Sequence, residues 1–112
     1  MKEHFELFQQ VEDALSNSDY ARMMAIAEPL ANSGVAWAKA TVASLFHLGL
    51  GVHRDLNKAE ALYLEAYEAG DELAMIDLVA FYEVAQQPEK ANKFRLECIS
   101  RGCEFYGPDD KE

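Results

Sequence analysis

The fold is decided by residues 34–70, which read GVAWAKATVASLFHLGLGVHRDLNKAEALYLEAYEAG. On both sides of a central loop, apolar residues recur three and four positions apart, which is the period of an amphipathic helix. They are Ala38, Val42, Leu45 and Phe46 before the loop, and Ala59, Leu62, Tyr63 and Ala66 after it. In the loop, Gly49 and Gly51 permit the backbone conformation that ends a helix, and Asp55 can cap the next one. The stretch therefore predicts two helices joined by a loop.

This pattern recurs along the chain with a period of 36 residues. A shift by that period superposes apolar residues on apolar residues, for example Ala38 on Ala74. A glycine, which favours the end of a helix, follows each unit. These glycines are Gly34, Gly70 and Gly102. The last spacing is only 32 because the loop of the third unit is four residues shorter, so the sequence predicts three helical hairpins.

We predict six helices in an all-α fold. They cover residues 3–16, 19–32, 35–48, 55–69, 71–85 and 88–101. Pro29 lies inside the second helix, where it removes a backbone donor and is expected to kink the helix or divide it into two pieces. The chain forms one domain over residues 1–104, with units at 3–34, 35–70 and 71–102, followed by a solvated acidic tail at 105–112.

Acidic residues dominate the charge, with 20 Asp and Glu against 10 Lys and Arg and a net charge of -10. A phosphate backbone or an anionic membrane would be repelled, so we expect neither nucleic acid nor membrane as a partner, whereas a basic protein would be attracted. No apolar run reaches transmembrane length, and the N-terminus lacks a secretory signal, so we expect a cytoplasmic protein. Cys98 and Cys103 are expected to be reduced thiols.

Residues 34–70 resemble one Sel-one-like repeat, a relative of the tetratricopeptide repeat. The resemblance is carried by Ala38, Val42-Ala43, Phe46, Gly49-Leu50-Gly51-Val52, Asp55, Lys58-Ala59, Leu62-Tyr63, Ala66-Tyr67 and Gly70. The third unit lacks the glycine loop, and the first unit keeps only its second helix recognisably. The resemblance implies a right-handed α–α superhelix of about three stacked hairpins that binds other proteins.

In folds of this kind the first helix of each hairpin lines the concave surface. The resemblance places there Trp37, Thr41, Ser44 and His47, and in the next unit Leu73, Ile76, Asp77, Ala80 and Glu83. Trp37 is either an anchor for a partner or packs beneath the preceding helix, against Leu30 or Pro29. Leu73 and Ile76 would otherwise be exposed together, so they could instead cover a homodimer contact.

Catalytic and metal-binding motifs are missing from the sequence. The three histidines have no i, i+4 pair that would place two metal ligands on one helix face, and no nucleophile elbow or phosphate-binding loop is present. We therefore predict no enzyme activity, cofactor or metal. The predicted function is a non-catalytic protein–protein interaction module. The alternative is a small acidic inhibitor, such as an immunity protein, that neutralises a toxin or a nucleic-acid-binding protein by presenting carboxylates in place of phosphates.

Overall fold

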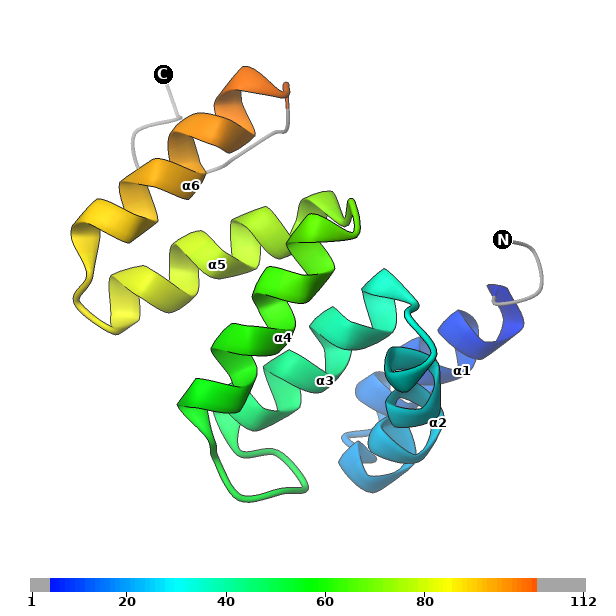
Figure 1. Ribbon diagram of the computed structural model, residues 1–112. Coiled ribbons are helices and arrows are strands. Elements are labelled where there is room, and N and C mark those ends of the chain that lie inside the picture. Colours follow the sequence, from blue (N-terminus) through cyan, green and yellow to red (C-terminus); the bar gives the residue numbers. More distant parts are fainter. Residues whose placement is uncertain (1–4, 103–112) are drawn as a thin grey trace.

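Six α-helices make up the part of the chain that the computed structural model describes, residues 5–102 (Figure 1). They are α1 (Phe5–Ser16), α2 (Tyr20–Asn32), α3 (Ala36–Leu48), α4 (Leu56–Glu68), α5 (Glu72–Val84) and α6 (Pro88–Ser100). Each helix packs against the next one along the chain, and no strand occurs between residues 5 and 102. The predicted all-α fold and its six helices are confirmed, while the predicted acidic tail at 105–112 lies outside the described residues.

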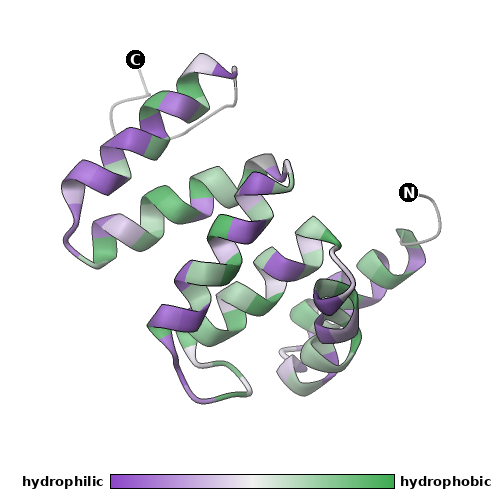
Figure 2. Cartoon of the chain, in the orientation of Figure 1, coloured by the Kyte–Doolittle hydropathy of each residue, from purple (hydrophilic) through white to green (hydrophobic). Residues whose placement is uncertain are grey.

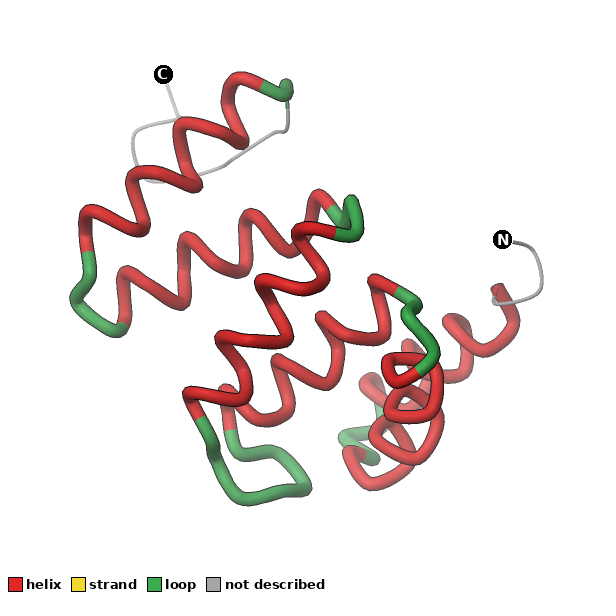
Figure 3. The backbone as a smooth tube through the Cα atoms, in the orientation of Figure 1, coloured by secondary structure: helices red, strands yellow, loops and turns green. Residues whose placement is uncertain are grey.

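The helix boundaries follow the period that the sequence predicts. Helix α3 begins at Ala36 and α5 at Glu72, 36 residues later, and the same interval separates Tyr20 at the start of α2 from Leu56 at the start of α4. Figure 3 shows that the connection from α3 to α4 is a long loop, whereas the one from α5 to α6 is short. The shortened loop of the third unit is therefore confirmed.

The loop at 49–55 connects α3 to α4 within the central hairpin and also approaches the hairpin before it. Gly49 ends α3 in the left-handed conformation, with a φ of 68°, and the Asp55 carboxylate accepts a hydrogen bond from the backbone N–H of Lys58 at 3.1 Å. At Gly51, a Cβ atom would lie only 3.0 Å from the Cβ of Tyr20, at the start of α2. The absence of a side chain at Gly51 thus lets this loop approach the first hairpin closely.

Pro29 does not divide α2, which is one continuous helix from Tyr20 to Asn32. The expected division is wrong because Pro29 lies in the last turn, where only one intrahelical hydrogen bond is lost. The carbonyl groups of this turn remain occupied, since the N–H of Ser33 donates to the Pro29 oxygen at 3.1 Å and that of Val35 to the Leu30 oxygen at 3.0 Å.

The core combines small residues at the helix contacts with large residues between them. The alanines Ala43, Ala59, Ala66 and Ala74 are fully buried and allow neighbouring helices to approach. Larger buried side chains fill the space that remains, namely Leu45, Leu78, Phe81 and Tyr82. Figure 2 shows that α5 is apolar along most of its length whereas α6 is mainly hydrophilic, which fits a central helix and a terminal one.

Helix α6 covers the end of this core with Ala91, Phe94 and Cys98. Cys98 is fully buried and disulfide-bonded, so the expected reduced thiol is wrong for this residue. Cys103, the other cysteine, lies outside the described residues. Because disulfides are rare in the cytosol, the cytoplasmic location remains only a prediction.

Replacing Tyr82 with phenylalanine is expected to lower the free energy of unfolding by about 1.5–3 kcal/mol, because its hydroxyl donates to the Glu60 carboxylate at 2.6 Å and bonds to charged groups are strong. Tyr63→Phe is a matched control. Tyr63 is 3% exposed against 2% for Tyr82, but its hydroxyl pairs with the neutral Ser44 hydroxyl at 3.0 Å, so about 0.5–1.5 kcal/mol is expected. Urea denaturation measures both losses. Equal losses would show that the charge on Glu60 adds nothing.

Candidate functional site

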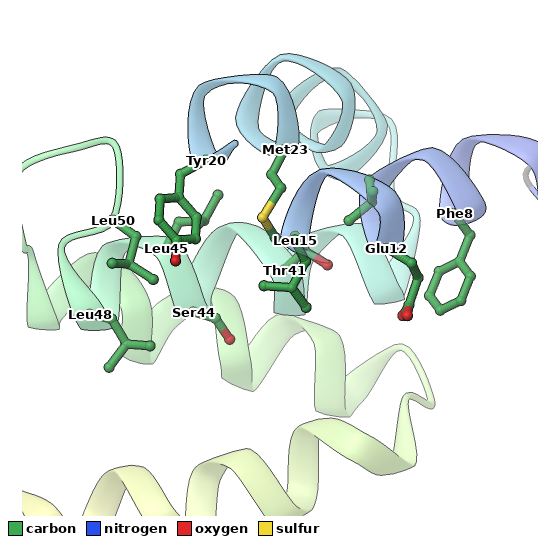
Figure 4. Close-up of a pocket in the computed structure, with 11 residues that line it drawn as sticks. Phe8, Glu12, Leu15, Tyr20, Met23, Thr41, Ser44, Leu45, Leu48 and Leu50 are labelled. Carbon is green, nitrogen blue, oxygen red and sulfur yellow. The ribbon is translucent and has the colours of Figure 1, made fainter. Parts of the chain in front are cut away.

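A hollow of about 310 Å³ opens between α1 and α3, beside the start of α2. Its lining is mainly apolar and comprises Phe8, Val11, Glu12, Leu15, Tyr20, Met23, Thr41, Ser44, Leu45, Leu48 and Leu50. Figure 4 shows how side chains of α1, α2 and α3 converge on it, with Leu50 added by the loop that follows α3. The hollow therefore depends on contacts between the first and second hairpins.

A second hollow, of about 170 Å³, continues the first towards α5. It is lined by Phe8, Glu12, Trp37, Ala40, Thr41, Ser44, Asp71, Leu73 and Asp77. Four of these residues, from α1 and α3, also line the first hollow; they are Phe8, Glu12, Thr41 and Ser44. We call these two adjoining hollows the first-helix groove, because the first helices of all three hairpins contribute to it.

Large apolar side chains remain exposed along this groove. Leu48 is 60% exposed and Leu73 is 66% exposed, and each lines one of the two hollows. Trp37 is half-buried, and its ring meets that of Phe8 edge to face with 5.1 Å between the ring centroids. Trp37 thus packs against α1 and also lines the second hollow, where an incoming side chain could contact it.

The Asp, Glu, Lys, Arg and His side chains that line the groove are all acidic: Glu12, Asp71 and Asp77. Burial, followed by the charge of nearby Asp71, raises the pKa of Asp77 to about 6. Within residues 5–102, neither a salt bridge nor a hydrogen bond engages the Asp77 carboxylate, and the salt bridges found there lie elsewhere. Asp77 is therefore a half-buried carboxylate that lacks a compensating cation in this part of the chain.

A polar cluster lies beside the groove, between α3 and α4. The Tyr63 hydroxyl is 3.0 Å from the Ser44 hydroxyl and 3.5 Å from Nδ1 of His47. Burial raises the pKa of Tyr63 to about 12. The hydrogen bond to Ser44 lowers this pKa, and the negative charge of Asp77 raises it further. The pKa of His47 is lowered, first by burial and then by Arg54.

Five of the nine residues predicted for a partner surface line the groove. They are Trp37, Thr41, Ser44, Leu73 and Asp77. The other four do not line it: His47 packs its ring 5.0 Å from that of Phe81, Glu83 pairs with Arg95, and Ile76 and Ala80 line neither hollow. The groove thus follows the first half of α5 and leaves its second half out.

Sequence reasoning missed the contributions of α1 and of the loop. The missed residues are Phe8, Val11, Glu12 and Leu15 of α1 and Leu50 of the loop, together with Tyr20 and Met23 of α2, Leu48 at the end of α3 and Asp71 before α5. The first unit matches the repeat only in its second helix, so nothing in the pattern aligned α1 with α3. The apolar spacing of Phe8, Val11 and Leu15, at three and four positions, is the signal that could have pointed to α1.

The described residues contain neither a metal site of three or more candidate ligands nor a membrane-spanning helix. Between residues 5 and 102, no three His, Cys, Asp or Glu side chains are arranged to hold a metal ion. None of the six helices has both the length and the apolar character that crossing a membrane requires.

Comparisons with protein-family models, with curated proteins and with solved structures found no match to this chain, so the family expected from residues 34–70 stays a prediction.

Proposed function

We propose that this chain is a non-catalytic Sel-one-like repeat protein that binds a partner polypeptide in the first-helix groove. The proposal includes a right-handed superhelix of three stacked hairpins, supported by the recurring helix boundaries and by the glycine loop at 49–55. The observation that carries the binding function is the groove itself, whose two adjoining hollows are lined by α1, α3 and α5 and bordered by exposed leucines. An exposed apolar surface in a concave site favours binding of a partner.

A matched pair of double variants tests this function. Leu48→Ser/Leu73→Ser removes apolar surface from the groove, while Val84→Ser/Leu96→Ser removes it from side chains that are 68% and 63% exposed elsewhere. Tagged wild-type and variant chains are used to capture proteins from native lysate, and retained proteins are identified by mass spectrometry. We expect the groove variant to retain at least about tenfold less of a protein that the wild-type chain retains specifically, since burying one leucine contributes about 1.5–3 kcal/mol.

The control variant is expected to retain this protein at the wild-type level. Equal loss in both double variants would show that general surface hydrophobicity, and not the groove, holds the partner. If the retained protein is a second copy of this chain, the groove or the surface beside it is a homodimer contact. Sedimentation of the purified chain distinguishes that result from a foreign partner.

The acidic inhibitor remains a second candidate, because three carboxylates and no Lys, Arg or His line the groove and the net charge is -10. This function predicts one stoichiometric basic protein that is released as salt screens the charges. Its activity would be inhibited by the wild-type chain. Retention that survives moderate salt and requires Leu48 and Leu73 favours the interaction module instead.

A further inference from the structure

The groove is chemically divided along its length. The hollow between α1 and α3 is lined mainly by apolar side chains and has one carboxylate, Glu12. The hollow towards α5 is smaller and brings Glu12 together with Asp71 and Asp77. An occupant that spans both hollows would therefore meet an apolar surface at one end and a negatively charged one at the other.

The surroundings of Asp77 match a long cationic side chain. Trp37 and Leu73 provide apolar surface in the same hollow, and Thr41 and Ser44 provide hydroxyl groups. Lysine and arginine bury their methylene stems against such apolar surface while the charged head reaches a carboxylate, and an indole ring also attracts a cation. A metal ion fits less well, because no three candidate ligands among residues 5–102 are arranged to hold one.

Charge also favours this occupant before any contact forms. A half-buried carboxylate without a cation is unfavourable, and a second carboxylate nearby, that of Asp71, increases this effect. A positive charge supplied by a partner removes the penalty in the complex but not in the free protein, so the gain contributes directly to affinity. The net charge of -10 would also accelerate the approach of a basic segment.

We propose that the occupant of the first-helix groove is a cationic amphipathic polypeptide segment, whose lysine or arginine pairs with Asp77 while its apolar side chains fill the hollow between α1 and α3. This inference rests on the proposed function and names the chemistry of the partner. In this proposal, Asp77 selects a positively charged side chain of the segment. Leu15 and Leu48 contact the apolar side chains of the segment.

Trp37 provides the readout, because it is the only tryptophan of the chain and lines the groove. Three short tryptophan-free peptides are titrated while its fluorescence is recorded: an amphipathic helical peptide of leucine and lysine, the same pattern with glutamate in place of lysine, and one with serine in place of leucine. We expect the leucine–lysine peptide to bind and the other two to bind at least about tenfold more weakly.

Asp77→Asn should weaken binding of the leucine–lysine peptide about tenfold, whereas Glu28→Gln, which removes one exposed charge of α2 outside the groove, should leave it unchanged. Equal weakening in both variants would mean that only net charge matters and would overturn the proposal. Equal binding of the lysine and glutamate peptides would also overturn it. Failure of the leucine–lysine peptide to bind the wild-type chain would overturn this inference alone, since the pull-down with the leucine variants decides the proposed function separately.

Carboxyl-carbon NMR of Asp77 shows directly whether the cation pairs there. Its pKa, about 6 in the free protein, is expected to fall by about 1–3 when the peptide binds. An unchanged pKa in the complex would overturn the proposal. Lys2 of the chain itself lies outside the described residues, and the Lys2→Ala variant tests whether it pairs with Asp77 in the free protein. A further rise of the Asp77 pKa in this variant would identify Lys2 as the cation and would also overturn the proposal.

Discussion

Replacing Phe81 with alanine is expected to lower the free energy of unfolding by about 3–5 kcal/mol, as removal of a buried aromatic ring usually does. Phe81 is 4% exposed and lies where three helices meet. Its ring contacts the rings of His47, Tyr63 and Tyr82 at centroid distances of 5.0, 5.9 and 5.4 Å. Alanine therefore leaves a cavity and also removes edge-to-face contacts that contribute about 0.5–1.5 kcal/mol each.

Urea denaturation of the wild-type chain and the variant measures this loss, with an unchanged slope against denaturant as the sign that the folded state is preserved. Val84→Ala is the matched control, since Val84 lies on the same helix but is largely exposed, and about 0.5 kcal/mol or less is expected. If Phe81→Ala does not fold, Phe81→Leu should still lose about 1.5 kcal/mol or less. A loss for alanine no greater than that of the control would show that the ring is not tightly packed.

Replacing Asp77 with asparagine is expected to stabilise the protein by about 1–2 kcal/mol at pH 7. In the folded protein, burial and Asp71 raise the pKa of Asp77 to about 6, whereas an aspartate in an unfolded chain titrates near 3.9. This difference corresponds to about 3 kcal/mol for a fully desolvated group, and the remaining solvent contact of Asp77 reduces it. Asparagine has a similar shape and carries no charge to bury.

The direction of the pH dependence follows from the raised pKa. Between about pH 4 and pH 6 the folded protein holds a proton on Asp77 that the unfolded chain has released, so this residue contributes less stability as the pH rises through this window. The advantage of asparagine should therefore be near zero at about pH 4 and reach its full value above about pH 6. Thermal or urea unfolding of both proteins at matched pH measures this difference, and His47, which titrates in both, cancels from it.

A constant difference between the two proteins from pH 4 to pH 7 would contradict this origin of the effect. The expected result has a functional side as well, because the same substitution should weaken binding of a cationic segment while it stabilises the free protein. Binding sites commonly contain groups that reduce stability in this way. An Asp77→Asn chain that is more stable and binds the leucine–lysine peptide equally well would overturn the proposed pairing of Asp77 with a cation and leave only its effect on stability.

The sequence alone determined the helices and their order. The apolar spacing in residues 34–70 and the period of 36 predicted where α2 to α5 begin and end, since both depend on local periodicity and on the residues that end a helix. The Asp55 cap was predicted for the same reason. The continuity of α2 through Pro29 was not predicted, although the predicted end at residue 32 already placed Pro29 in the last turn, where the residues that follow the helix occupy its carbonyl groups.

Only the tertiary structure decided which side chains share the groove. Trp37, Thr41 and Leu73 could be placed on a first helix by spacing, but the position of α1 against α3, which brings Phe8 and Glu12 to the same hollow, follows from packing between residues far apart in the sequence. The state of Asp77 was likewise hidden, because its pKa depends on burial and on the charge of nearby Asp71. Helical periodicity is a local property, whereas burial and the grouping of charges arise only when the hairpins pack together.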